Sequence, residues 1–324
     1  MIWYVLSAVA VLVFVDLLTR IYFGRIVLRH FETKPAFNIA PSPADPRGEL
    51  IEIPASGGLT LRGSLYRQAF RTPVGLIVFF PELDGNHWSA LNYCEALFEA
   101  GFDVLSVDVR NQGDSDYEPG YEPLQWFTSR EAEDVRSVFR WIENESELKA
   151  LPLGVMGVSR GSNAAMLAAA EHPSVKAVCC EGGYPTAGLQ LRYSQRWAVL
   201  YIPLWLVRIL PEWHYRYTLA LVRLISEWRR GHRYVMIERM LPRLRNRPVL
   251  LIGGERDNYV PPDVVEHLAQ RIGGTATRCW IVPRSRHNGG RVAAREVYDQ
   301  TLLRFFQTSF GHEPSRDIAT ARTA

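Results

Sequence analysis

Cysteine is scarce and scattered in this sequence of 324 residues. The four cysteines form no CxxC pair, and no histidine stands near them at the spacing of a metal site. Cys179 and Cys180 are adjacent, and neighbouring cysteines rarely bridge each other because the geometry is strained. These features argue against a disulfide, redox or metal site. They predict that Cys94, Cys179, Cys180 and Cys279 are buried thiols in a reducing compartment.

A large charge of one sign is also missing. Lys and Arg together number 37 and Asp and Glu 34, so the formal net charge is +3 and nucleic acid is not expected as a partner. With 47% hydrophobic and 22% charged residues, the composition argues against a disordered, fibrous or fully membrane-embedded chain. The length allows one large or two modest domains, with a core that needs no disulfide or metal.

One long apolar run is present at the amino terminus. Residues 2–18 are apolar except for Ser7 and Asp16. As a helix they would be about 26 Å long, and extension to Phe23 gives about 33 Å, enough for a hydrocarbon core of about 30 Å. Trp3 and Tyr22 would lie near the two interfaces. We therefore expect residues 1–35 to form a membrane anchor and a juxtamembrane segment.

Two alternatives to an anchor remain open. A cleaved signal peptide normally has positive charge before the apolar run and small residues after it, and this sequence has neither. A helix packed on the protein itself is favoured mildly by Asp16. The basic residues all follow the run, so the positive-inside rule places the rest of the chain in the cytoplasm. They are Arg20, Arg25, Arg29 and Lys34.

Strand and helix patterns alternate after a Pro-rich connector. Short apolar or alternating runs predict strands at residues 50–54, 59–66, 75–80, 102–107, 151–157, 175–180, 248–253 and 278–282. Helical stretches are expected at residues 89–100, 131–143, 160–170 and 292–307. This alternation is typical of βαβ units, so we predict an α/β fold with a mostly parallel sheet flanked by helices.

One long segment interrupts the alternation. Residues 185–247 show no strand pattern, only aromatic-rich helical stretches separated by Pro and Gly. We interpret the segment as an inserted, all-helical cap. The predicted organisation is an anchor (1–35), a core in two parts (36–184 and 248–310), the insert (185–247) and a flexible tail (311–324).

The motif G-x-S-x-G occupies residues 157–161, directly after a predicted strand and at the start of a helix. This is the context of a nucleophile elbow, in which a tight turn holds the serine hydroxyl at the carboxyl edge of the sheet. The alternative is a glycine-rich turn with a structural serine. We predict that Ser159 is a catalytic nucleophile.

A serine nucleophile needs a base and a carboxylate that orients the base, and on such an elbow scaffold they follow in the order Ser, acid, His. Asp257 follows the strand at residues 248–253, with Glu255 as a rival for the acid. His287 lies in the loop after the last strand, and it is the only histidine in a suitable loop. The prediction is a triad of Ser159, Asp257 and His287.

An oxyanion hole would complete the site. It needs the amide that follows the nucleophile and a second amide from the loop after residues 75–80. These positions select the backbone N–H groups of Arg160 and Leu83.

With these motifs the sequence resembles the α/β-hydrolase superfamily over roughly residues 50–306. Residues 108–115 (DVRNQGDS) resemble the D-x-R-G-x-G-x-S turn of that family, and residues 254–261 (GERDNYVP) resemble its acid loop. The resemblance implies the α/β-hydrolase fold with the helical insert as its cap. A membrane-anchored subset of these hydrolases carries a similar amino-terminal span.

The sequence departs from the family pattern at two places. Pro81 and Glu82 stand where the oxyanion loop of that family usually begins with His-Gly, just before Leu83. Asn111 replaces the usual Gly of the D-x-R turn, a position where Asn tolerates unusual backbone angles.

The insert has an unusual balance of charge. It holds twelve arginines against three glutamates, whereas the rest of the chain sums to −6. Arginine interleaved with Trp and Tyr suits a membrane interface with anionic lipid, beside which the enzyme would draw acyl substrates from the bilayer. A solvated basic face over an ordinary aromatic core is an equal alternative.

The function expected from the sequence is hydrolysis of a carboxylic ester or thioester of an acyl or lipid-like substrate, without cofactor or metal. One alternative is a serine peptidase of the same fold, with Glu82 or Glu181 as a clamp for a peptide terminus. Another is a non-catalytic, membrane-tethered binding protein. The expected partners are the substrate and the membrane, the latter through the anchor and the cap.

Overall fold

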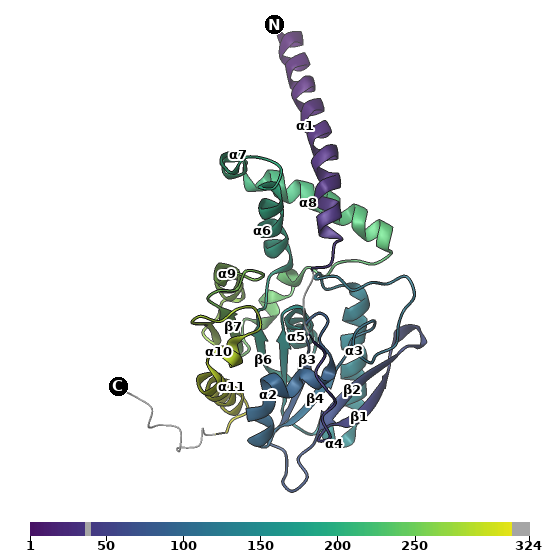
Figure 1. The fold of residues 1–324 in the computed structure, drawn as a ribbon, viewed down its shortest axis with the longest axis vertical. Helices are drawn as coiled ribbons and strands as arrows, with labels where there is room; N and C mark the ends of the chain where they lie inside the picture. Colours follow the sequence, from purple (N-terminus) through teal and green to yellow (C-terminus); the bar gives the residue numbers. More distant parts are fainter. Residues whose placement is uncertain (36–39, 313–324) are drawn as a thin grey trace, which may run out of the picture. The chain divides into compact units, whose positions relative to one another are not determined.

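The computed structural model describes residues 1–35 and 40–312 (Figure 1). The chain divides into two compact units. The anchor–cap unit consists of Met1–Pro35 and Ala187–Tyr234, and the core unit consists of Ala36–Thr186 and Val235–Ala324. The expected anchor and most of the expected insert thus belong to one unit, while residues 235–247 belong to the core. The predicted tail lies outside the described residues from residue 313 onward.

The core unit is built on one sheet with the strand order β1-β2-β4-β3-β5-β6-β7-β8. The strands are β1 Glu49–Pro54, β2 Thr60–Tyr66, β3 Leu76–Phe80, β4 Asp103–Val107, β5 Leu153–Val158, β6 Val175–Glu181, β7 Val249–Gly254 and β8 Thr277–Val282. β1 and β2 pair antiparallel, and β2 pairs antiparallel with β4. All other pairs are parallel. The predicted α/β class and mostly parallel sheet are therefore confirmed, with strand ends within two residues of those expected.

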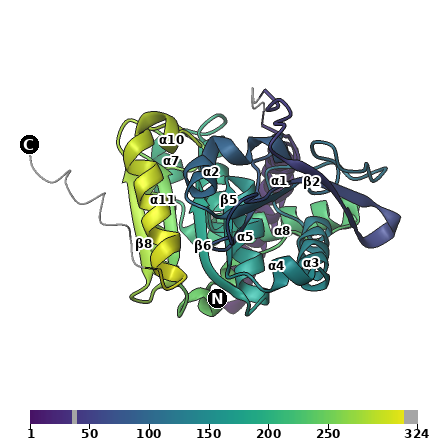
Figure 2. The ribbon, with the colours of Figure 1, turned by 90° about the horizontal axis from the view of Figure 1, so that it is seen from below.

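Helices cover both faces of this sheet (Figures 1 and 2). α2 (Ala90–Glu99) and α11 (Arg295–Ser309) contact each other on one face. α3 (Ser129–Asn144) and α5 (Arg160–Glu171) pack together on the other, where α9 (Pro262–Ile272) covers β7 and β8. Short helices complete the unit: η1 Ser56–Gly58, η2 His87–Ser89, α4 Ser146–Lys149, η3 Ile237–Arg239, η4 Leu241–Leu244 and α10 Gly290–Ala293.

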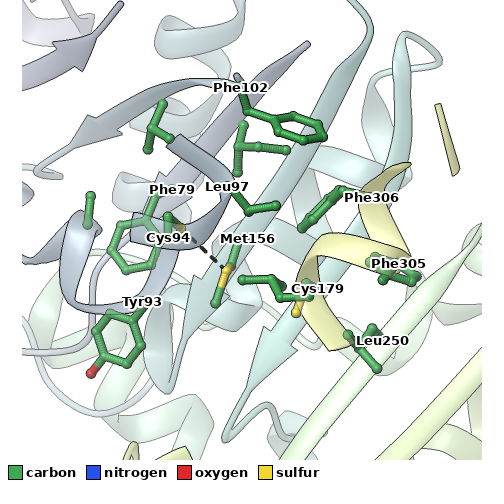
Figure 3. Close-up of a cluster of buried hydrophobic side chains, with 14 of the residues drawn as sticks. Phe79, Tyr93, Cys94, Leu97, Phe102, Met156, Cys179, Leu250, Phe305 and Phe306 are labelled. Atoms are coloured by element: carbon green, nitrogen blue, oxygen red, sulfur yellow. Dashed lines mark hydrogen bonds between the residues drawn. The ribbon is translucent and has the colours of Figure 1, made fainter. Parts of the chain in front are cut away.

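The main core lies between the sheet and the pair α2 and α11 (Figure 3). Phe79, Met156 and Cys179 on the strands are fully buried there, as are Leu97 of α2 and Phe306 of α11. Each such large apolar side chain contributes roughly 1.5–3 kcal/mol when it leaves water. This packing makes the sheet a rigid platform for the loops at its edge.

The prediction of four buried cysteines is wrong for one of them. Cys94, Cys179 and Cys180 are buried, but Cys279 is exposed. Cys279 lies on β8, which is an edge strand and pairs only with β7. An edge strand has one flank without a neighbour, and sequence pattern alone does not reveal which strand takes that place.

The anchor–cap unit contains four helices: α1 Ile2–Phe31, α6 Thr186–Ala198, α7 Leu204–Ile209 and α8 Glu212–Arg230. Pro203 and Pro211 precede α7 and α8, and Gly231 ends α8 in the left-handed conformation with φ 66°. α1 is long and apolar enough to cross a membrane, with a mean hydropathy of 2.2 over its most apolar window.

The second half of α1 is packed within this unit. Arg20 is 8% exposed and donates hydrogen bonds to Asp16 of α1 and to Thr218 and the His214 carbonyl of α8. Its guanidinium also lies 4.8 Å from the ring centre of Tyr217. Part of the predicted membrane anchor is therefore a packed helix, as the charge of Asp16 suggested.

Candidate active site

β5 ends in a sharp turn that places Ser159 immediately before α5. Ser159 has φ 51° and ψ −118°, a strained conformation for a residue with a side chain. A Cβ atom on Gly157 would lie 2.1 Å from the Gly161 carbonyl oxygen, and one on Gly161 would lie 2.1 Å from that of Phe80. The turn therefore closes only with glycine at both positions, which is the physical reason for the G-x-S-x-G spacing.

The structure brings three predicted side chains into one hydrogen-bonded row. Ser159 Oγ lies 2.9 Å from His287 Nε2, and His287 Nδ1 lies 2.6 Å from Asp257 Oδ2. The other Asp257 oxygen accepts the N–H groups of Tyr259 and Val260, both at 2.8 Å. The carboxylate is thus fixed with one oxygen toward the imidazole. A proton held on Nδ1 by this carboxylate leaves the lone pair of Nε2 directed at the serine hydroxyl.

Glu255, the rival acid, lies elsewhere. It is exposed, and its carboxylate accepts the backbone N–H of Arg284 at 2.7 Å. Asp257 is 4% exposed and contacts His287 directly. The geometry favours Asp257 over Glu255 as the partner of the imidazole.

The two amides expected to form an oxyanion hole lie on segments that touch. Arg160 is the first residue of α5, so its N–H is among the amides at the helix start that no helical carbonyl accepts. The loop after β3 approaches the same turn, because the Gly161 position lies against the Phe80 and Pro81 carbonyls. Leu83 follows in that loop and is 2% exposed.

A buried side chain that the sequence did not single out as functional ties these segments together. Gln112 Nε2 donates to the Glu82 carbonyl at 2.7 Å and to the Gly85 carbonyl at 3.2 Å. Gln112 Oε1 accepts a hydrogen bond from the Arg160 guanidinium at 2.7 Å. The Glu82 carbonyl and the Leu83 N–H belong to the same planar peptide group. Gln112 therefore fixes the direction in which the Leu83 N–H points.

The hydrogen-bond network of Gln112 and Arg160 extends to α3. The Arg160 guanidinium also pairs with Glu131 of α3 and donates to the Leu124 carbonyl at 3.2 Å. Glu131 in turn caps the start of α3 by accepting the N–H of Thr128 at 2.9 Å. Gln112 and Arg160 are 7% and 4% exposed, so their hydrogen bonds are shielded from water.

Two further carboxyl groups are buried near the site. Glu181 ends β6 and accepts hydrogen bonds from Tyr298 Oη at 2.7 Å and the Gly290 N–H at 2.8 Å. Glu82 accepts a long hydrogen bond from Tyr93 Oη at 3.4 Å. Burial raises the pKa of both carboxyls above its usual range. Neither presents the exposed charge that a clamp for a peptide terminus requires.

One cluster among the described residues has metal-ligand chemistry. His87, Asp108 and Asp114 bring ligand atoms within 4.8 Å of one another. Their mutual hydrogen bonds explain the arrangement, since Asp114 bonds to His87 Nε2 at 3.0 Å and donates its N–H to Asp108 at 3.0 Å. The cluster closes the turn of residues 108–115, in which Asn111 has φ 59°, as predicted for this position.

Comparison with known proteins supports the fold. Residues 76–205 match the sequence profile of the alpha/beta hydrolase fold. The fold is that of the α/β hydrolases. An esterase of Pyrococcus furiosus superposes with a TM-score of 0.63 at 18% identity, covering 86% of this chain and all of that one (100%). Est1E from Butyrivibrio proteoclasticus with bound ferulic acid gives a TM-score of 0.57 at 17% identity, covering 81% of this chain and 99% of that one.

Two curated proteins are also similar in sequence. The uncharacterized protein YqkD of Bacillus subtilis is 24% identical over 259 residues, which cover 78% of this chain and 77% of that protein. A putative phosphoribosyl transferase of Mycobacterium tuberculosis is 28% identical over 136 residues, which cover 41% of this chain and only 28% of that protein. The resemblance to α/β hydrolases seen in the motifs is thus confirmed at the level of the fold.

Proposed function

We propose that this α/β hydrolase cleaves carboxylic esters or thioesters by nucleophilic catalysis at Ser159. The observation that carries the proposal is the row from Ser159 Oγ to His287 Nε2 at 2.9 Å and from His287 Nδ1 to Asp257 at 2.6 Å. A serine hydroxyl becomes nucleophilic only when a base removes its proton, and this geometry supplies the base. Neither a metal nor a cofactor enters the scheme.

The reaction would run in two balanced steps. Ser159 Oγ attacks the carbonyl carbon while His287 Nε2 takes the hydroxyl proton, and the Leu83 and Arg160 amides stabilise the resulting oxyanion. His287 returns the proton to the departing oxygen or sulfur as the acyl bond to it breaks. Water then attacks the acyl-enzyme with His287 again as base, releasing the acid and restoring Ser159. Asp257 holds the imidazole and stabilises its protonated form throughout.

The anchor–cap unit supports an acyl or lipid-like substrate. Trp205, Trp213 and Trp228 of the cap are exposed by 64%, 64% and 83%. They are joined by exposed Leu200, Leu204, Ile209, Tyr217, Leu221, Leu224 and Ile225. Such a concentration of exposed aromatic and aliphatic side chains is typical of an interaction surface rather than of a solvated face. This favours the membrane-interface interpretation of the cap over the ordinary aromatic core.

The same unit limits how deeply α1 enters a bilayer. Residues 2–15 precede the packed Asp16–Arg20 pair and would be about 21 Å long, less than the roughly 30 Å of a hydrocarbon core. We propose that these residues insert from the cytoplasmic side and that the cap lies in the interface. Arg25 and Arg29, both exposed, follow the apolar run and suit anionic lipid on that side.

The test is hydrolysis of p-nitrophenyl esters from acetyl to palmitoyl by the full-length protein in detergent. Ser159→Ala should lower turnover by a factor on the order of 10⁵–10⁶. Ser137→Ala is the matched control, because that hydroxyl is buried in α3 and bonds the Glu133 carbonyl. A preference for long chains would support the lipid-like substrate class. Equal rates for wild type and Ser159→Ala at every chain length would reject ester hydrolysis at Ser159. The peptidase and the binding protein would then become the leading proposals.

A further inference from the structure

A groove lies inside the anchor–cap unit, between α1 and the helices of the cap. Its volume is about 230 Å³. The walls are apolar on both sides, with Phe23, Ile26 and Val27 from α1 facing Trp197, Ala198 and Ile202. All of these residues belong to the same compact unit.

Arg20 and the hydroxyl groups on the groove walls are hydrogen-bonded within the protein. The charge of Arg20 is balanced by Asp16 at 2.6 Å, and its remaining N–H groups are directed at α8. Tyr215 Oη donates to the Val207 carbonyl at 3.0 Å, and Ser194 Oγ donates to the Leu191 carbonyl at 2.8 Å. An occupant with polar groups would find these donors already used and would lose its own hydration. The chemistry of the walls therefore selects a hydrocarbon.

Size narrows the choice of occupant. An engineered protein cavity of about 150 Å³ lined by Leu, Ile and Phe binds benzene, so the present groove offers room for a larger apolar group. An extended alkyl chain is slender enough to lie in this space.

The proposed membrane surroundings of the groove contain alkyl chains. α1 presents exposed apolar residues before the groove, including Phe14 at 59% and Leu17 at 52% exposure. The cap presents Trp205 and Ile209 at 64% and 66% exposure. In the proposed membrane-bound state these side chains lie among lipid tails, which are then the most concentrated apolar ligand near the groove.

We infer that this groove binds an acyl chain of a membrane phospholipid. The inference uses the proposed membrane association and is independent of the proposed hydrolysis at Ser159. The chain would pack between α1 and the segment from Trp197 to Ile202, adding a specific lipid contact to the general attraction of the apolar surface. Because the groove is narrow, it would accept one chain and leave the polar head of the lipid outside.

The experiment is photocrosslinking of the full-length protein in phosphatidylcholine vesicles that contain a phospholipid with a diazirine midway along one acyl chain. Crosslinked residues are located by mass spectrometry after vesicle flotation. We expect adducts on Phe23, Val27 and Trp197, in addition to adducts on the exposed first turns of α1. Adducts confined to residues 2–15 and to exposed cap residues would overturn the inference, because the chains would then lie against the protein without entering the groove.

A pair of variants tests the groove directly. Ala198→Trp fills it with an indole ring and should reduce the adducts on Phe23 and Val27 about tenfold, equivalent to about 1.4 kcal/mol of binding. Ala220→Trp makes the same substitution at an exposed position of α8 outside the groove and should leave them unchanged. Equal adduct yields in the two variants would also overturn the inference. If Ala198→Trp fails to fold, the wild-type adduct map decides alone.

Flotation separates this inference from the function proposed above. A protein that does not float with vesicles would overturn both the membrane association and the lipid groove. Flotation without groove adducts would overturn the groove alone. Neither result bears on ester hydrolysis, which the Ser159→Ala comparison measures.

Discussion

Gln112→Leu is expected to impair catalysis without touching a reacting atom. The substitution keeps the approximate size of the side chain but removes both donors to the Glu82 and Gly85 carbonyls and the acceptor for Arg160. The peptide between Glu82 and Leu83 then keeps one described hydrogen bond, from the Gly85 N–H at 3.0 Å to the Glu82 carbonyl. The Leu83 N–H, which we propose as an oxyanion donor, then loses the constraint that fixes its direction.

The size of the effect follows from the number of bonds lost. Two neutral hydrogen bonds contribute about 1 kcal/mol each and the one to the charged Arg160 about 1.5–3 kcal/mol, so the free energy of unfolding should fall by roughly 3.5–5 kcal/mol. Loss of one oxyanion donor costs about 2.7–4 kcal/mol of transition-state stabilisation. A donor that is misdirected rather than deleted should lower kcat about 10–100-fold. KM should change little, because the oxyanion exists only after attack.

Gln68→Leu provides a matched control for this prediction. Gln68 Nε2 also donates to two backbone carbonyls, those of Phe98 and Phe102, and its Oε1 also accepts from an arginine, Arg71. Both variants should lose stability in urea unfolding, but only Gln112→Leu should lose kcat on a p-nitrophenyl ester. A folded Gln112→Leu protein with wild-type kcat, or an equal loss of kcat in Gln68→Leu, would refute the reasoning.

Three further predictions concern stability and membrane binding. Burial raises the pKa of Glu181, so this group contributes stability that is complete below the usual pKa of 4.5 and is lost as the pH rises through the raised pKa. Glu181→Gln should therefore flatten the decline of the unfolding free energy above about pH 4.5, and an unchanged slope would contradict this. Asp134→Ala leaves the buried Arg110 guanidinium without its main partner and should cost about 3–5 kcal/mol in urea unfolding, whereas a cost under about 1 kcal/mol would contradict the buried-pair argument. Trp205→Ser should weaken vesicle flotation, while Tyr117→Ser, at an exposed aromatic of the core unit, should not; equal flotation would contradict the role of the cap.

The parts of the site that local chemistry dictates could be predicted from the sequence. The elbow needs glycine at positions 157 and 161 because a Cβ atom at either position would lie too close to neighbouring backbone atoms. Apolar runs predicted the parallel strands, and parallel strands bring the loops that carry Asp257 and His287 to one edge. The expected chain order of Ser, acid and His on loops that follow strands therefore placed three residues far apart in sequence at one site.

The parts that depend on tertiary packing could not be predicted. Nothing in the residues around Gln112 indicates that its amide reaches Glu82, thirty positions earlier. The edge position of β8, and with it the exposure of Cys279, depends on the order of all the strands. The packing of α1 on α8 was indicated only by the charge of Asp16. The residues of α8 that hold Arg20 of α1, His214 and Thr218, lie almost two hundred positions later in the sequence.

The most direct test of the account is covalent labelling with a fluorophosphonate, which phosphonylates a serine only where a base and an oxyanion hole activate it. We predict one adduct, on Ser159, found by peptide mass spectrometry. The adduct should be absent in Ser159→Ala and formed much more slowly in His287→Ala, while Ser137→Ala labels like the wild type. A folded wild-type protein that forms no adduct, or forms it on a serine other than Ser159, would contradict the claim that Ser159, His287 and Asp257 act together as a catalytic site.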